Sequence, residues 1–418
     1  MASLPTYRKP DDVRFTCSRC AECCRRFNVP LAPGEAASLD ALDWGAHGVE
    51  LRMTSGVVRD PSGERLARHG DGACVYLGEQ GLCRIQEHFG AEAKPLACRL
   101  YPFTLRRIGG RVAVDVAFSC RAVSRNDGAP LDAQVADWQT LVGEWACERP
   151  YLLTAKYRIH GDLLWELLDV LDGYLADDDR PLADRVRAGL LFLRLATTGD
   201  PSTAAASTLR RIMAERAPAQ LAGMAAPGVE LDRTQAAVFR QWLCLALNPA
   251  PIDLGTWPKA TRDAELKRRN AVLRQYREET GRPSVDNREI NVSFAELQAI
   301  DIAWLRTTEA EATIARFLRA KLIGQRFRFE RSRELPLVDA VHRLFLLWPM
   351  ALWAARALAG DRGAAAVEAV DLAEAMRLVD LSMDGLSTSV LKRKQREAWE
   401  FAITETDLAV TAAAAFCA

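Results

Sequence analysis

Beyond about residue 130, apolar residues recur at helical spacing almost to the end of the chain. The clearest stripe consists of Leu163, Leu164, Leu167, Leu168, Leu171 and Leu175. Spacings of three and four residues place such side chains on one face of a helix. Similar patterns predict helices at about 183–197, 205–216, 233–247, 261–279, 293–324, 335–358, 367–382 and 388–403. We therefore expect an all-α domain over residues 131–418.

The first 125 residues show short apolar runs, many glycines and little periodicity. A helix start is predicted within 31–39, where the acidic Glu35 would stand in the first turn. The runs 103–108 and 109–118 flank a Gly-Gly turn, and the second run alternates apolar and polar residues, which predicts a hairpin. The expected fold is mainly α, with a small irregular domain at 1–125 that contains this hairpin and a larger helical domain after it.

Composition is that of an ordinary globular protein, with 49% hydrophobic and 26% charged residues. Lys+Arg and Asp+Glu both total 55, so nothing in the charge indicates a nucleic-acid partner. The N-terminus lacks the apolar run of a signal peptide. The longest apolar run, 344–355, is shorter than the roughly 20 residues that span a bilayer, so we interpret it as a core helix. These features predict a cytoplasmic protein with reduced thiols and no membrane partner.

Cysteines are concentrated near the N-terminus. Eight of the 11 are Cys17, Cys20, Cys23, Cys24, Cys74, Cys83, Cys98 and Cys120. Thiolates repel one another and oxidise easily, so a cytoplasmic protein gathers them where a metal binds them. The small domain is thus expected to be organised by a metal. Cys147, Cys244 and Cys417 have no neighbour at ligand spacing, and Cys244 is predicted to be a core residue.

The run Cys17-x2-Cys20-x2-Cys23 presents three sulfurs on one loop, which suits either zinc or an iron–sulfur cluster. Three such cysteines followed by a distant fourth are typical of bacterial ferredoxins. Structural zinc sites more often use two separated Cys-x2-Cys pairs, and the later cysteines here are single. The spacing therefore favours iron–sulfur, with zinc as the alternative. Adjacent side chains are expected to diverge, so either Cys23 or Cys24 would bind a second centre or stay a free thiol.

Several charged residues near the cysteines have two readings. Arg25, Arg26 and Arg99 could offset the charge of a thiolate centre or be solvated surface residues. His88 is isolated, and we interpret it as structural rather than as a ligand. Farther along, four arginines interleave with two phenylalanines, which we read as a turn rather than an anion site; they are Arg326, Arg328, Arg331 and Arg333 with Phe327 and Phe329.

Four cysteine-containing elements follow one another in a specific order. They are Cys17-x2-Cys20-x2-Cys23-Cys24, Gly72-Ala-Cys74, Gly81-Leu-Cys83, and Lys94-Pro-Leu-Ala-Cys98-Arg-Leu-Tyr-Pro-Phe103. Over about residues 15–122 the chain resembles the CxxCxxCC cysteine-cluster family, a zinc- or iron-chelating family grouped with flagellin lysine N-methylases.

The resemblance implies a function and a ligand set. All eight clustered cysteines would be metal ligands, of a 4Fe-4S cluster or of zinc. The implied reaction is methyl transfer from S-adenosylmethionine to lysine, which would make the chain a protein-lysine N-methyltransferase with a substrate such as flagellin. Whether eight thiols fill two four-sulfur sites or one site plus extra structural cysteines is left open, as are the catalytic residues and the oligomeric state.

The sequence shows no further mark of methyl transfer. It has neither a Gly-x-Gly-x-Gly loop after a strand nor a Cys-x3-Cys-x2-Cys run, and its first cysteines are more tightly spaced than in the flagellin methylases. Two alternatives therefore stand beside the enzyme. One is a non-enzymatic metalloprotein whose cluster stabilises a binding surface. The other is an iron–sulfur redox protein in which Cys23 or Cys24 is a reactive thiol.

Overall fold

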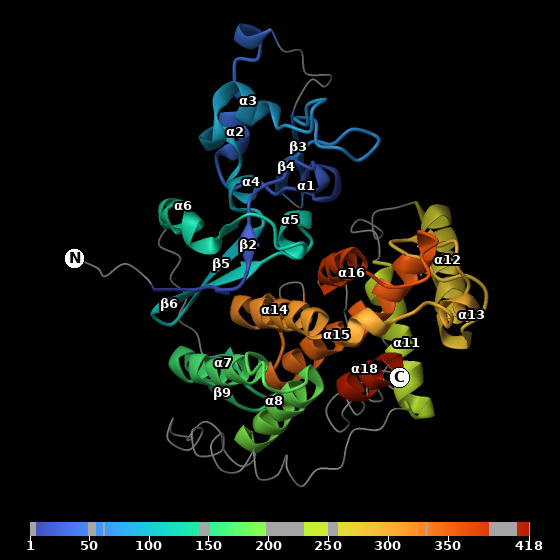
Figure 1. The fold of residues 1–418 in the computed structure, drawn as a ribbon. Coiled ribbons are helices and arrows are strands. Elements are labelled where there is room, and N and C mark those ends of the chain that lie inside the picture. Colours follow the sequence, from blue (N-terminus) through green and yellow to red (C-terminus); the bar gives the residue numbers. More distant parts are fainter. Residues whose placement is uncertain are drawn as a thin grey trace. The chain divides into compact units, whose positions relative to one another are not determined.

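The computed structural model describes residues 6–48, 56–61, 63–141, 151–197, 230–249, 258–330, 333–383 and 408–417 (Figure 1). Contacts divide the chain into two compact units. The helical unit comprises Met1–Val13, Leu105–Ser119 and Ala146–Ala418, and the cysteine unit comprises Arg14–Thr104 and Cys120–Trp145. The fold is mainly α, as predicted. The hairpin from Leu105 onward and the first 13 residues belong to the helical unit, whereas the predicted division lies near residue 125.

The helical unit contains a three-stranded sheet in the order β1-β6-β5. Its strands are β1 (Thr6–Arg8), β5 (Phe103–Ile108) and β6 (Arg111–Val116). The predicted hairpin is confirmed as β5 and β6, and β1 pairs in parallel with β6. Every side chain from Val112 to Val116 is buried, and helix α14 (Thr308–Gly324) packs against β6. This cover from a distant helix explains why the hairpin is part of the helical unit.

The rest of this unit is a group of helices with α15 at its centre (Figure 1). They are α7 (Gly161–Leu175), α8 (Leu182–Ala196), α11 (Arg233–Leu247), α12 (Lys259–Glu278), α13 (Phe294–Leu297), α15 (Leu337–Asp361), α16 (Ala369–Ser382) and α18 (Leu408–Cys417). The leucine stripe forms α7, and all its members except the half-buried Leu163 are buried. Apolar burial of this kind is the main source of helix stability in proteins.

Helix α15 is the core helix that the apolar run predicted. It contacts α16, α18, α14, α8 and α11. Within the described residues it is the one helix long and apolar enough to cross a membrane by length and composition, but 78% of its most apolar window is buried in the protein. That burial fits a core helix.

Most predicted helices are confirmed within a few residues, and one is not continuous. The predicted helix 293–324 divides into α13, the 3-10 helix η7 (Ala303–Arg306) and α14. Ser293 and Thr307 accept backbone N–H groups as N-caps, so each begins a new helix. The predicted helices 205–216 and 388–403 lie outside the described residues.

Small elements connect the helices, so this unit is not purely α. They are the strands β8 (Tyr151–Leu152), β9 (Arg158–Ile159), β10 (Ser284–Val285), β11 (Arg288–Glu289), β12 (Phe329–Glu330) and β13 (Arg333–Glu334), and the 3-10 helix η8 (Arg326–Arg328). The arginine-rich turn has a structural role at Arg328, which is buried and donates to Glu334 at 2.6 Å. Arg331 is outside the described residues.

A buried charge cluster connects β6, α14 and α16. Lys321 Nζ lies 3.2 Å from a carboxylate oxygen of Asp115 and 2.9 Å from one of Asp380. It also donates to the Val116 carbonyl at 3.0 Å, while Asp380 accepts the Ser119 backbone N–H at 2.8 Å. Gly324 permits the close approach of α14 to β6, because a Cβ at this position would lie 2.4 Å from the Asp115 Cα. Burial acts to lower the pKa of Lys321, but the two carboxylates more than offset it and raise the pKa.

The cysteine unit is built from short elements. Its strands are β2 (Arg14–Phe15), β3 (Val57–Asp60), β4 (Gly63–Leu66) and β7 (Ala129–Pro130), paired antiparallel as β2 with β7 and β3 with β4. Its helices are α1 (Glu22–Arg26), α2 (Glu35–Asp40), α3 (Arg84–Phe89), α4 (Leu96–Leu100), α5 (Arg121–Ser124) and α6 (Val135–Leu141), with the 3-10 helices η1 (Gly45–His47), η2 (Ala91–Ala93) and η3 (Leu131–Gln134).

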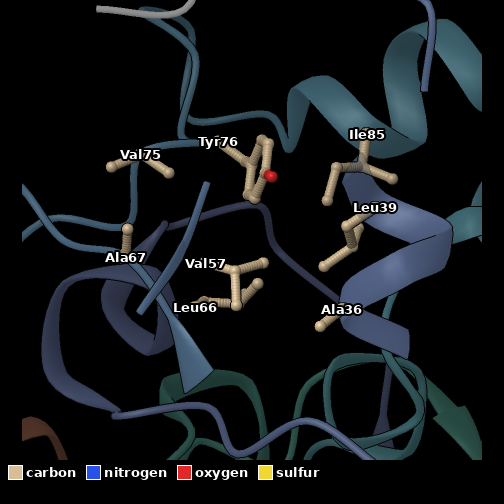
Figure 2. Close-up of a cluster of buried hydrophobic side chains, with 8 residues drawn as sticks. All are labelled: Ala36, Leu39, Val57, Leu66, Ala67, Val75, Tyr76 and Ile85. Atoms are coloured by element: carbon tan, nitrogen blue, oxygen red, sulfur yellow. The ribbon is translucent and has the colours of Figure 1, made fainter. Parts of the chain in front are cut away.

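A small apolar cluster forms the core of this unit (Figure 2). Its buried members are Ala36, Leu39, Val57, Leu66, Ala67, Val75, Tyr76 and Ile85. The predicted helix start appears at Glu35, whose carboxylate accepts the backbone N–H groups of Ala32 at 2.7 Å and Leu96 at 2.6 Å. A second group of aromatic rings, Phe15, Phe103 and Trp138, packs with centroid distances of 5.3 and 5.0 Å.

Candidate metal centre

The first four cysteines lie on a curled loop that runs into α1. Arg19 and Ala21 adopt left-handed backbone conformations, with φ of 56° and 60°, which is uncommon for residues other than glycine. Gly81 packs against this loop, since a Cβ there would lie 2.9 Å from the Arg19 carbonyl oxygen. Cys17 and Cys20 are exposed on the loop, whereas Cys23 and Cys24 are half-buried on α1.

Cys74, Cys83 and Cys98 are partly buried and pack against the apolar core of the unit. The backbone joins this group to α1, because the Cys74 N–H donates to the Cys24 carbonyl at 2.8 Å. Cys74 and Cys83 lie on one loop, in which the Leu77 N–H donates to the Cys74 carbonyl at 3.0 Å and Leu77 forms an isolated β-bridge with Cys83.

Cys120 comes from the second stretch of the cysteine unit and is the N-cap of α5. Helix α5 packs against β2, which ends two residues before Cys17. Gly128 lies against Thr16, since a Cβ at Gly128 would be 2.3 Å from the Thr16 backbone nitrogen. The Thr16 N–H also donates to the Asp127 carbonyl at 3.1 Å. The segments that carry Cys17 and Cys120 are therefore held side by side.

The thiols act on one another electrostatically, with Cys23 at the junction. Its sulfur lies 4.0 Å from that of Cys24. The Cys24 thiol, then burial, raises the pKa of Cys23 far above its usual range. The prediction that these adjacent side chains diverge is therefore wrong. Successive helical residues differ in direction by only about 100°, so two side chains can still turn toward each other.

The remaining half-buried thiols divide into two sets of neighbours. Burial first, then the proximity of Cys83 and Cys23, raises the pKa of Cys74 to about 11. Burial, with Cys74, Cys83 and Cys23 nearby, raises the pKa of Cys98 to about 12. Burial also raises the pKa of Cys120 to about 11, but its thiol neighbours are Cys20 and Cys23.

Seven of the eight predicted ligands are thus linked through sulfur–sulfur interactions, and the backbone places the eighth, Cys17, beside the segment of Cys120. Among the described residues, however, no three Cys, His, Asp or Glu side chains are close enough to hold a metal ion as they stand. The donor chemistry fits a metal, since clustered thiolates are the preferred ligands of zinc and of iron–sulfur centres. Binding would require these sulfurs to approach further and to lose their protons.

Two cations that sequence reasoning missed lie near the sulfurs. Arg68 lowers the pKa of Cys74 against the effect of burial, and Lys94 does the same for Cys98. Arg68 is held by the Gly72 carbonyl at 2.6 Å, the Arg26 carbonyl at 3.2 Å and the Asn28 side chain at 3.3 Å. Lys94 belongs to the fourth cysteine-containing element, so its position in the sequence could have indicated that it lies near a thiol. The cysteine spacing gave no such indication for Arg68.

The arginines and the histidine near the cysteines mainly have structural roles. Arg26 pairs with Glu22, and Arg99 pairs with Glu92 at 2.5 Å, while Arg25 is exposed. His88 packs its ring against those of Trp44 and His47, with centroid distances of 6.3 and 5.3 Å.

The other cysteines stand apart from the cluster. Cys244 is buried on α11 as predicted, and burial raises its pKa to about 12. Cys147 and the side chain of Cys417 lie outside the described residues.

Comparison with known proteins identifies the cysteine region alone. Residues 16–125 match the family CxxCxxCC, described as "Putative zinc- or iron-chelating domain". The match supports metal binding by this part of the chain. It covers about a quarter of the sequence and includes all eight clustered cysteines. No curated protein and no solved structure matches the chain. The grouping with flagellin methylases is therefore not shown.

Proposed function

We propose that the cysteine unit binds two adjacent iron–sulfur centres, each ligated by four thiolates. One set consists of Cys17, Cys20, Cys23 and Cys120, and the other of Cys24, Cys74, Cys83 and Cys98. The observation that carries this proposal is the division of the thiols into two neighbour groups that meet at the Cys23–Cys24 pair.

The first set combines the three-cysteine loop with a distant fourth residue. Cys120 has Cys20 and Cys23 as thiol neighbours, and α5 and β2 keep its segment beside that of Cys17. We assign the last cysteine of the run, Cys24, to the second set, because its carbonyl accepts the Cys74 N–H. Two-cluster bacterial ferredoxins use the same logic, because the fourth cysteine of each of their runs ligates the other cluster.

The second set lies beside apolar side chains, where a negatively charged metal centre needs positive charge nearby. Cys74, Cys83 and Cys98 pack against the apolar core, and burying uncompensated negative charge is unfavourable. Arg68 and Lys94 supply positive charge at that side. A bound iron–sulfur cluster would supply one-electron transfer there, and we infer that these two cations would tune its potential.

Metal and acid-labile sulfide analysis of anaerobically purified protein tests the proposal. We expect about eight iron and about eight sulfide per chain, as for two four-iron clusters. Cys120→Ser and Cys98→Ser should each lower both values by about half, while the matched control Cys244→Ser leaves them unchanged. Stoichiometric zinc without sulfide would replace the iron–sulfur assignment by the zinc alternative. Loss of all the iron in both Cys120→Ser and Cys98→Ser, from a wild-type content of about four, would reject the two-centre arrangement.

Lysine methylation and a cytoplasmic location stay predictions. Calorimetry with S-adenosylmethionine on metal-loaded protein, and lysine methylation of flagellin in cells with and without the gene, test the first. Absence of both binding and methylation would leave the redox and the purely structural alternatives. A reversible change in visible absorbance on adding reductant would favour the redox protein.

A further inference from the structure

The helical unit contains a cavity of about 210 Å³ between α13, α15 and α18. None of its lining residues is one of the eight clustered cysteines. Its walls are largely aromatic and apolar: Phe294, Leu297, Trp353 and Phe416. The rings of Phe294 and Trp353 are 6.0 Å apart at an angle of 43°. Ala295, Gln298 and Glu279 lie at the rim, where they are exposed.

One cation, Arg356, also lines this cavity. One of its guanidinium nitrogens donates to the Gln298 carbonyl at 2.7 Å, but its buried Nε has no hydrogen-bond partner among the described residues. Burial lowers the pKa of Arg356, with no carboxylate to offset that effect. A partly buried guanidinium without an anionic partner is unfavourable, and a bound anion would relieve this.

The nearest acidic residue of the lining is already engaged. Glu279 accepts from Arg240 at both carboxylate oxygens, at 2.6 and 3.0 Å. Its charge is therefore neutralised by another arginine, and the electrostatic character of the cavity is set by Arg356.

We propose that this cavity binds a small carboxylate that carries a single aromatic ring. The ring would lie among the aromatic walls, and the carboxylate would accept from the guanidinium of Arg356. The volume suits this size, since an apolar cavity of about 150 Å³ is known to hold benzene. Neither the metal centre nor methyl transfer is needed for this site.

Saturation-transfer NMR with the full metal-loaded chain, using benzoate as the probe and neutral benzyl alcohol as its isosteric partner, tests the site. We expect the wild type to bind benzoate at least about tenfold more tightly than benzyl alcohol, the ratio that about 1.4 kcal/mol of charge-assisted bonding gives. Absence of saturable benzoate binding, or equal affinity for the two probes, would overturn the proposal.

Two variants locate the binding. Arg356→Gln should weaken benzoate about tenfold or more and leave benzyl alcohol nearly unchanged, while the control Arg274→Gln, at an exposed position on α12, affects neither. Ala295→Trp adds bulk from the exposed rim and should abolish both. If Arg356→Gln fails to fold, the Ala295→Trp result decides alone. Benzoate binding that survives Ala295→Trp would place it elsewhere and reject the site.

Discussion

The two units deal with buried reactive groups in opposite ways. In the helical unit, the buried ammonium of Lys321 meets two carboxylates, so positive and negative charge are both supplied by the chain. In the cysteine unit, half-buried thiols lie near one another, and burial together with this proximity raises the pKa of Cys98, while the Cys24 thiol and then burial raise that of Cys23. The Lys321 cluster is thus electrostatically complete, whereas the clustered thiols lack a counterpart that the chain does not provide. A bound cation is the natural complement of clustered thiolates.

The size of the two cores strengthens this contrast. The helical unit buries whole helix faces, as on α7 and α15. The apolar cluster of the cysteine unit has eight buried members on short elements. Small units with limited cores usually need a metal or disulfides to fold stably. We therefore expect the two units to differ most when the metal is removed.

The largest expected effect is that of Cys20→Ser or of metal removal on the cysteine unit. Metal binding typically supplies about 10 kcal/mol or more of folding free energy in small metal-organised domains. Hydrogen exchange should show α1 to α4 losing protection while α7, α14 and α15 keep theirs. Ser18→Ala, in the same loop, serves as the control and should change nothing. Loss of protection in both units together would show that they do not fold independently, and full protection everywhere would show that the metal is not structural.

The next largest effect is expected from Lys321→Met in the helical unit. Removing the ammonium leaves Asp115 and Asp380 as uncompensated buried charges, which typically costs about 3 to 5 kcal/mol. Urea denaturation monitored on the helical unit measures this, with exposed Lys259→Met as the matched control. Adding Asp115→Asn and Asp380→Asn should restore part of the loss, and metal content should not change. A loss below about 1 kcal/mol would contradict the role assigned to the cluster.

Features of the fold and of the site could be predicted from the sequence where they depend on residues close together in the chain. The leucine stripe of α7 and the Gly-Gly turn of the hairpin are local patterns, and both were confirmed. The cover of β6 by α14 joins segments about 200 residues apart, so no periodicity reveals it. At the site, spacing identified the eight cysteines as a group. It could not show that Cys120 neighbours Cys20 and Cys23, because that depends on α5 packing against β2.

A smaller effect is expected from Arg68→Met, which removes hydrogen bonds to the Arg25 and Arg26 carbonyls at the end of α1 and to Gly72 and Asn28. Bonds from a charged group contribute about 1.5 to 3 kcal/mol each at most, and partial solvation lowers this, so we expect a loss of about 2 kcal/mol in the cysteine unit. Denaturation of the metal-loaded protein measures it, with exposed Arg25→Met as the control. Equal losses in the two variants would reject a specific role for Arg68.

The last effect is absent at neutral pH and appears only as a pH dependence of the helical unit above about pH 9. The folded-state pKa of Cys244 is raised from 9.0 to about 12 by burial, so its neutral thiol favours the folded state. This contribution is fully present below pH 9 and is lost as pH rises toward 12, at about 1.4 kcal/mol per pH unit. Comparing Cys244→Val with wild type between pH 9 and 11 isolates the slope. Parallel curves would show that this thiol does not titrate with unfolding.

The buried pairing of Lys321 with Asp115 has a consequence for the order of events during synthesis. The two residues are 206 positions apart, so at about 5 to 20 residues per second the lysine is made roughly 10 to 40 s after the aspartate. The cysteine unit is complete by residue 145 and can capture its metal on the ribosome within that interval. The hairpin that interrupts it has to wait for α14. Metal supply during translation, rather than after release, would then set the yield of correctly assembled protein.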